Sequence, residues 1–421
     1  MNYSTLLVAL CIIAFCSCES QSPIEIQKSP LTVEDPPWLK SARKRIELYR
    51  MEDMVIKVKD RQGNSISNAE VQVEMTSHAF DFGSLLGDRR FEGLPNPEDA
   101  QRHLELVENY FNKVAAIRAN DAVCDNALSW LNSRNIEVRG HYLMWARIQP
   151  GERRGQPEEM PEDKEVLREV AFEFIEEMIT WAGDRISEWN LINHIVTTVN
   201  DHLGFDQLFG TEIFADVIHF ARELAPPGVE MWVNEGRILP GSGNRQGKYY
   251  DVIQQLIELD AEPDGIGFMS HFKGEDDLVG MEEIYSRLDR FAELVPNLQL
   301  TELDIDVDDQ NLHAAYLRDV MTIAFSHPAV SGIIVWQVWG SNPQNKTLWN
   351  PDWTIKPAGE AWIDLVYDQW WTDETGRTDG NGTFGIRGFL GDYQITVRVG
   401  DETKTIDSKL IPDGVNIDVI F

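Results

Sequence analysis

A buried strand at residues 298–305 carries the side chain with the clearest chemistry, the carboxylate of Glu302. The strand is mostly apolar, so we expect it to deliver Glu302 to a mouth of low polarity. A carboxylate in such a place suits attack on a sugar carbon. Hydrolysis of a glycosidic bond normally needs a second carboxylic acid, which protonates the leaving oxygen. The corresponding strand end at residues 189–194 offers Asn193 and His194 instead.

Polar and aromatic residues end most of the short apolar runs in the middle of the chain. These strand-end residues are His141, Tyr142, Trp145, Asn193, His194, Asn234, Glu235, His271, Glu302, Asp304, Trp336 and Trp339. Three of the nine histidines end three different runs, and this joint placement favours one shared site over three separate structural histidines. The tryptophans at these ends are candidates for stacking on pyranose rings. No histidine pair has the helical spacing of a zinc site, so we expect neither a metal nor a cofactor.

Eight short apolar runs alternate with amphipathic helical stretches through the middle of the chain. The runs are residues 80–86, 114–118, 137–145, 186–194, 229–235, 265–271, 298–305 and 332–339. Helical patterns at residues 166–182, 212–224 and 314–325 separate some of them. This alternation predicts a (β/α)₈ barrel over residues 79–371. In such a barrel the carboxyl ends of the strands form the active site, which is where the polar residues fall.

The two ends of the chain have a different sequence pattern, in which apolar and polar residues alternate as they do in half-buried strands. Residues 54–64 and 69–75 indicate two strands joined by a Gly-Asn turn. The segment after residue 371 has the same alternation. Because neither end alone has enough strands for a stable sandwich, we expect residues 41–78 and 372–421 to form one small β-sandwich together.

Residues 1–18 resemble a signal peptide of the lipoprotein type, with an apolar run too short to span a bilayer. Cys18 is then the lipidated residue, and residues 19–40, rich in Ser, Pro and Glu, are a linker. We expect a lipoprotein of the cell envelope, in the periplasm or outer membrane, with secretion as the alternative. The formal net charge of -33 argues against nucleic acid as a partner, and a lipid anchor would be the sole membrane contact. Cys124 alone lies in the body, which excludes a disulfide framework.

The order of motifs resembles glycoside hydrolase family 10, the xylanase family. Residues 140–145 (Gly-His-Tyr-Leu-Met-Trp) are similar to its Gly-His-x-Leu-x-Trp segment, and residues 264–271 to its Asp-Gly-Ile-Gly-x-Gln-Ser-His segment. Residues 301–304 (Thr-Glu-Leu-Asp) match its nucleophile motif. The resemblance implies a (β/α)₈ barrel and retaining hydrolysis of plant or algal polysaccharides. It places Glu302 at the nucleophile with His271 bonded to it.

By the same resemblance His141, Trp145 and Asn193 line the subsite where the bond breaks. The departures are equally specific. His194 stands where the family has its acid/base Glu, and Met269 where it has Gln. The family's Glu-Asn-x-x-Lys-Trp segment is absent, and residues 117–122 read Ile-Arg-Ala-Asn-Asp-Ala instead.

Three functions stay open on the sequence. The first is hydrolysis of a polysaccharide or oligosaccharide, expected to be acidic, with Glu302 as nucleophile and His194 or Glu235 as acid. The second is β-elimination on a uronic acid, by a lyase or dehydratase. There His194 or Tyr142 is the base, and the substrate carboxylate is gripped by Arg147, Arg237, His141 or His271. The third is a glycan-binding protein without activity, because the absence of one catalytic acid is the usual first sign that a hydrolase has lost its activity.

Overall fold

The computed structural model describes residues 35–197, 203–241, 243–340 and 344–421. The predicted signal peptide, its Cys18 and most of the predicted linker lie outside these residues. Among the helices of the described chain, none combines the length and the apolar character that a membrane crossing requires.

A closed barrel of eight parallel strands forms the central module of the described chain, as the sequence predicted. The strands are β3 (Asp81–Leu85), β4 (Lys113–Ala116), β5 (Glu137–Trp145), β6 (Glu188–Asn193), β7 (Glu230–Gly236), β8 (Gly265–Met269), β10 (Leu298–Asp306) and β11 (Val330–Val335). Each strand pairs in parallel with the next, and β11 closes the ring by pairing with both β10 and β3. The short β9 (His271–Lys273) extends the ladder along the end of β10.

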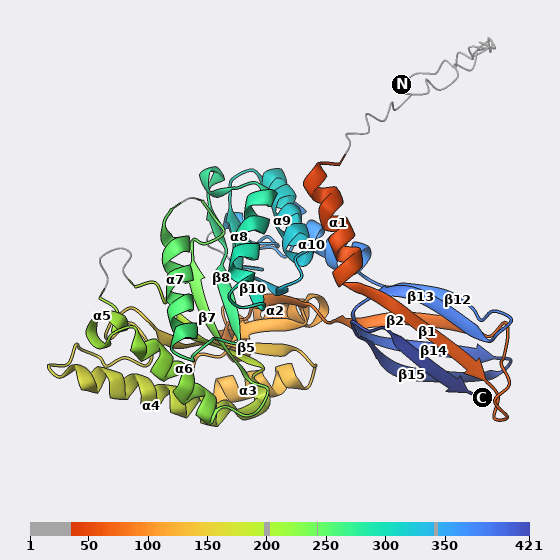
Figure 1. Ribbon diagram of the computed structural model, residues 1–421, viewed down its shortest axis with the longest axis horizontal. Helices are drawn as coiled ribbons and strands as arrows, with labels where there is room; N and C mark the ends of the chain where they lie inside the picture. The colour runs from red at the N-terminus through yellow and green to blue at the C-terminus, as the bar shows by residue number, and fades with distance from the viewer. Residues whose placement is uncertain (1–34, 198–202, 242, 341–343) are drawn as a thin grey trace, which may run out of the picture. The chain divides into compact units, whose positions relative to one another are not determined.

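Helices connect the strands and surround them (Figure 1). They are α2 (Pro97–Tyr110), α3 (Ala122–Asn132), α4 (Lys164–Ala182), α5 (Phe205–Phe209), α6 (Glu212–Leu224), α7 (Arg245–Glu258), α8 (Met281–Ala292), α9 (Gln310–Phe325) and α10 (Pro357–Ile363). In α6 the buried side chains recur at Ile213, Val217 and Ala221, which is the spacing of one helical face turned to the barrel. The (β/α)₈ fold class is therefore confirmed.

Two glycines let tryptophans pack flat against the neighbouring strand. A Cβ at Gly140 would lie 2.1 Å from the Trp189 ring, and one at Gly265 would lie 2.4 Å from the Trp232 ring. Both indoles are fully buried. Any side chain at these glycines would therefore force the strands apart.

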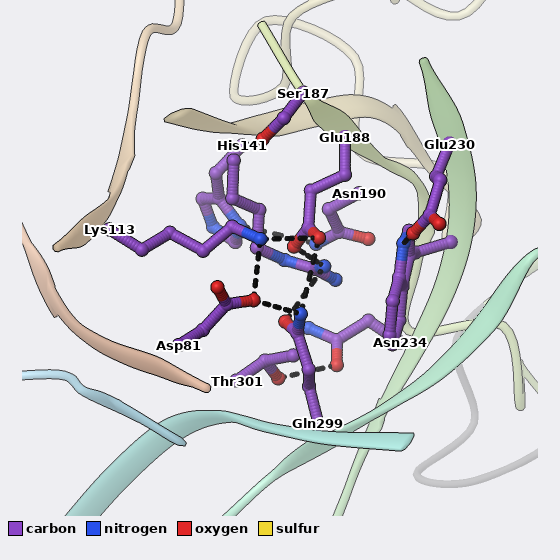
Figure 2. A network of polar contacts seen from close by, with 12 residues as sticks. Asp81, Lys113, His141, Ser187, Glu188, Asn190, Glu230, Asn234, Gln299 and Thr301 are labelled. Carbon is purple, nitrogen blue, oxygen red and sulfur yellow. Dashed lines mark hydrogen bonds and ion pairs between the residues drawn. The ribbon is translucent and has the colours of Figure 1, made fainter. Parts of the chain in front are cut away.

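The amino-terminal ends of the strands enclose a network of buried charges (Figure 2). Lys113 Nζ lies 2.7 Å from Asp81 and 2.8 Å from Glu188, and Arg139 Nη1 lies 2.6 Å from the other Glu188 oxygen. Gln299 donates to Asp81 and Glu188 at 3.1 Å each. Burial alone would raise the pKa of Glu188, but Lys113 and Arg139 outweigh it and lower that pKa. The network closes the barrel end opposite the strand ends predicted to carry the chemistry.

The two ends of the described chain form two sheets together, as predicted; the first has one antiparallel and one parallel pairing, and the second is antiparallel throughout. One has the order β13 (Thr383–Phe389), β1 (Met51–Lys59), β16 (Val415–Ile420); the other β12 (Asp373–Arg377), β2 (Glu70–His78), β14 (Gly391–Val399), β15 (Glu402–Leu410). Alternate residues such as Ile56, Val73 and Ile395 are fully buried in the shared core. The Gly-Asn turn reverses the chain and leaves Lys59 bridged to Ser65, but β1 and β2 do not pair with each other, because they lie in different sheets. A helix that the sequence analysis did not anticipate, α1 (Pro37–Tyr49), precedes β1.

Candidate active site

Three barrel strands carry an irregularity where their polar residues begin. The pairing register shifts between His141 and Met144 in β5, between Asn190 and Ile192 in β6, and between Leu300 and Leu303 in β10. Such a bulge interrupts the alternation by which successive side chains point to opposite faces of the strand, so the side chains that follow it point in a new direction. In β10 the consecutive residues Thr301 and Glu302 both reach the same amide, that of Asn234.

Glu302 is buried and held by groups from two other strands. Its Oε2 lies 3.0 Å from His271 Nε2, and its Oε1 accepts a hydrogen bond from Asn234 Nδ2 at 3.3 Å. His271 Nδ1 forms an ion pair with Asp304 at 2.9 Å, and Lys346 Nζ approaches the same Asp304 oxygen at 3.3 Å. The result is an alternating chain of charges that runs from Lys346 to the Glu302 carboxylate.

This chain fixes the protonation states of its members. Burial disfavours a charged His271, but its contacts with Asp304 and Glu302 prevail and raise its pKa to about 9. Burial would also raise the pKa of Glu302, yet the hydrogen bond from His271 and the neighbouring His141 and His194 lower it. Near neutral pH the pair is therefore an imidazolium beside a carboxylate, and Glu302 is in the state that a nucleophile needs.

A second set of polar groups continues from Glu302 along the strand ends. Thr301 Oγ1 donates to Asn234 Oδ1 at 2.7 Å, so the Asn234 amide nitrogen faces Glu302 and also donates to Asn193 Oδ1 at 3.2 Å. His141 Nδ1 lies 3.1 Å from Asn190 Nδ2. Burial lowers the pKa of His141 to about 4, so its ring is neutral at pH 7 and is a hydrogen-bonding group rather than a cation.

His194 follows β6 with a left-handed backbone, φ 58°, a conformation that non-glycine residues adopt mainly at constrained positions. Its ring packs edge-on against Trp145 with 4.2 Å between centroids. Its Nδ1 lies 3.6 Å from Glu235 Oε1, too far for a hydrogen bond but close enough for an ion pair. This leaves Nε2 as the ring nitrogen available to a substrate.

Glu235 does not present its carboxylate as the rival acid that the sequence suggested. The side chain is fully buried, and its oxygens accept hydrogen bonds from the backbone N–H groups of Val196 and Gly236 at 2.8 Å each. Arg245 Nη1 adds a contact at 3.4 Å. Glu235 is therefore placed as an acceptor behind His194.

A chain of ring contacts links the two predicted catalytic residues around the mouth of the barrel. From His194 and Trp145 it passes to Tyr142 at 5.2 Å, to His141 at 5.2 Å, to Trp336 at 5.1 Å and to His271 at 6.2 Å. His271 then contacts Glu302, which is linked through Asn234 to Asn193, the neighbour of His194 in the chain. The predicted site residues on strands β5 to β11 thus encircle one mouth.

The cations proposed to grip a substrate carboxylate are placed differently. Arg237 is ion-paired with Asp277 at 3.2 Å, and His271 is already held between two carboxylates. Arg147 is buried, and its Nε and Nη2 have no hydrogen-bond partner among the described residues. Tyr142 is a poor base, because burial raises its pKa despite nearby arginines.

Several residues of this site escaped the sequence analysis. Asn190 holds His141, Lys346 holds Asp304, and Arg153 lies over the Trp145 ring at 4.3 Å. Asp304 was among the predicted strand-end residues, two positions after Glu302 on the same strand. Lys346 ends the short 3₁₀ helix Gln344–Lys346, Arg153 lies in a loop, and neither residue had a signal in the sequence. Within the described chain, no group of three or more His, Cys, Asp or Glu side chains is arranged to hold a metal ion.

The fold and the site together define a (β/α)₈ barrel protein whose strand ends present a buried, ionised glutamate within a circle of aromatic and amide side chains. The family model of glycosyl hydrolase family 10 matches residues 75–365. This chain belongs to that family, and the resemblance expected from its motifs is confirmed.

Curated relatives match along most of this chain. The anti-sigma-I factor RsgI6 of Acetivibrio thermocellus is 28% identical over 381 residues, covering 87% of this chain and 47% of that protein. Endo-1,4-beta-xylanase 1 of Arabidopsis thaliana is 25% identical over 380 residues, covering 87% of this chain and 38% of that protein. The chain thus spans less than half the length of both relatives.

Solved structures share the barrel. Xylanase 10B from Thermotoga petrophila RKU-1, in complex with xylobiose, superposes with a TM-score of 0.59 at 20% identity, covering 69% of this chain and 95% of that one. The native xylanase 10B from Thermotoga maritima gives 0.58 at 20% identity, covering 69% and 96%. These likenesses support the fold.

Proposed function

We propose that this protein is a glycoside hydrolase that cleaves an acidic plant or algal glycan with Glu302 as its nucleophile. The observation that carries the proposal is the support of Glu302: His271 Nε2 at 3.0 Å, Asn234 Nδ2 at 3.3 Å and a lowered pKa in a fully buried setting. A buried carboxylate kept ionised in an apolar mouth is suited to attack a sugar carbon and form a covalent glycosyl ester.

In this proposal His194 takes the role of the missing acid. Protonated His194 gives its Nε2 proton to the leaving oxygen as Glu302 displaces it. Neutral His194 then takes a proton from the water that cleaves the ester, so each turnover restores both residues. Glu235, 3.6 Å from Nδ1, stabilises the protonated ring electrostatically.

The circle of aromatic and amide groups suits a pyranose chain. Trp336 and the face of Trp145 that Arg153 does not cover can stack on sugar rings, and Asn193 and His141 can form hydrogen bonds with hydroxyl groups. Of the four groups expected to grip an acidic sugar, Arg147 has buried N–H groups without a hydrogen-bond partner among the described residues, and it interacts electrostatically with Glu235.

A non-hydrolytic glycan-binding protein is the second candidate, and one comparison favours it. The relative that matches this chain at 28% identity is named as an anti-sigma-I factor, not as a hydrolase. Such a protein would use the same aromatic circle to bind a glycan without cleaving it.

We also propose that the chain is exported and acylated at Cys18. This proposal rests on the leader sequence alone. Labelling of cells with a radioactive fatty acid tests it, with Cys18→Ala as the control that must lose the label.

A product analysis separates the functions. The chain is incubated with a panel of neutral, uronate-bearing and sulfated plant and algal polysaccharides, and products are measured by mass spectrometry. Products that gain one water support hydrolysis, and Glu302→Gln must abolish them. Unsaturated uronates that absorb in the ultraviolet mean elimination instead. Measurable affinity without any product assigns the chain to glycan binding.

A further inference from the structure

A cavity of about 510 Å³ adjoins the active site at Trp336, which is one of the residues that line it. Its lining includes Trp336 and Trp339 together with three arginines, Arg89, Arg90 and Arg118. Trp336 also belongs to the catalytic circle, since its ring makes edge contacts with His141 and His271. A cavity of this volume lies in the range of ligand pockets.

Two of the three arginines have charges that the protein does not neutralise directly. Neither the Arg89 nor the Arg118 guanidinium makes a hydrogen bond or ion pair with the residues that the structure places. Arg90 is fixed by donation to His103 Nδ1 at 2.9 Å and to the Leu94 carbonyl at 2.6 Å, and it lies over the Trp339 ring. One arginine is therefore held rigidly, and two have free donors.

Asp88 is the acidic residue in the lining, and among the described residues it forms no ion pair with the three arginines. Asp88 accepts hydrogen bonds from the backbone N–H of Arg89 at 2.9 Å and from the Cys124 thiol at 3.8 Å. Arg154 lies close enough to interact electrostatically with both Arg118 and Asp88, which adds a fourth positive charge to the neighbourhood.

The grouping of Arg89, Arg90 and Arg118 around one cavity distinguishes them from an isolated surface arginine such as Arg61. The sequence has 70 acidic and 37 basic residues, and several surface arginines pair with a carboxylate. Arg102, Arg185 and Arg168 do so with Glu98, Asp125 and Asp216. Like charges gathered around one cavity repel each other unless an anion joins them.

We infer that this arginine cavity, lined by Arg89, Arg90 and Arg118, binds an acidic substituent of the glycan, a uronate carboxylate or a sulfate ester, while a neighbouring sugar lies in the catalytic circle. The inference rests on the proposed function for the position of that neighbouring sugar. Planar guanidinium groups bind both anions through paired N–H donors, and Trp336 gives the sugar between the two sites a face to stack on. Arg118 occupies the segment in which the family's Glu-Asn-x-x-Lys-Trp motif is absent.

The test measures binding without turnover. Glu302→Gln serves as the parent protein, and calorimetric titration compares three xylo-oligosaccharides of one length: neutral, glucuronate-substituted and sulfated. We expect an acidic probe to bind at least about tenfold more tightly than the neutral one, as charge-assisted hydrogen bonds imply. Adding Arg89→Gln and Arg118→Gln removes this preference and changes the affinity for the neutral probe by less than about twofold. The two acidic probes distinguish carboxylate from sulfate.

Arg61→Gln is the matched control, because Arg61 is an exposed arginine in the turn after β1 and its loss changes the net charge equally. This variant must retain the acidic preference. A second measurement needs no variant: the affinity of the unaltered chain for the acidic probe must fall with added salt, and that for the neutral probe must not.

Equal affinity for acidic and neutral probes in the parent overturns the inference, and so does a preference that survives loss of both arginines. The outcome is separate from that of the hydrolysis proposal. An arginine-dependent preference in a chain that releases no product leaves the cavity assignment standing and refutes hydrolysis. Cleavage of neutral xylan, together with equal affinity for acidic and neutral probes, supports hydrolysis and refutes the cavity assignment.

Discussion

Replacement of His194 by alanine should slow cleavage in proportion to how much the leaving group needs a proton. If His194 is the acid, its loss costs about 10² to 10⁴ in rate for a sugar leaving group, or roughly 3 to 5 kcal/mol in the barrier. A dinitrophenyl leaving group departs without protonation, so the rate of bond cleavage in the corresponding aryl glycoside should change by less than about tenfold. Glu302 attacks in both reactions, and its support from His271 and Asn234 does not involve His194.

The structure indicates that the variant will fold. Glu235 keeps its two backbone donors and Arg245 after the imidazole is removed. The lost packing against Trp145 at 4.2 Å costs about 1 kcal/mol of folding free energy. The assay measures initial rates on a xylo-oligosaccharide and the first-turnover burst of dinitrophenol release from the aryl glycoside, because the burst reports bond cleavage before His194 acts as base; Glu302→Gln is the control that loses both activities. An equal loss on both substrates, or no loss on either, would refute the role of His194 as acid.

Three further predictions concern the same residues and the buried network. His194→Glu should support xylan cleavage, because Glu235 lies near enough to keep the introduced carboxyl partly protonated. The release of reducing sugar from xylan measures this activity. No increase over the unaltered chain would mean that the altered subsites, and not residue 194 alone, prevent xylan cleavage. Lys113→Met should lower the free energy of unfolding in urea by about 3 to 5 kcal/mol, because Asp81 and Glu188 stay buried without their cation. Lys59→Met breaks an exposed ion pair and should lower it by under about 1 kcal/mol. Losses of similar size in the two variants would contradict the reasoning. His271 has a pKa of about 9 in the folded chain against 6.5 in the unfolded chain, so its contribution to stability is complete below pH 6.5 and is lost as the pH rises through 9. Urea unfolding from pH 6 to 10 should show the free energy of unfolding fall by up to about 3 kcal/mol, and His271→Gln should abolish this fall. The same dependence of the unfolding free energy on pH in that variant would exclude His271 as its source.

Much of the barrel was predictable from local pattern. The run at residues 137–145 and the helix at residues 212–224 coincide with β5 and α6, because short apolar runs and helical faces are properties of a few adjacent residues. The Gly-Asn turn was predicted correctly, but a turn signal does not say which sheet each strand joins. Helix α1 was missed because its segment begins within a Pro- and Glu-rich stretch.

For the candidate site too, some features could be predicted from the sequence and others depend on the tertiary structure. The sequence alone determined which residues end the strands, so Glu302, His271 and Asn193 could be assigned to one rim, and the motifs identified the family. Only the tertiary structure decided how these groups act. The bulges in β5, β6 and β10 depend on pairing with neighbouring strands, and they set which side chains meet. The pairing of Lys346 with Asp304, the burial of Glu235 behind His194 and the arginine cavity beside Trp336 join segments far apart in the chain. Protonation states follow from those contacts, because the pKa of a group depends on what surrounds it in space and not on its neighbours in sequence.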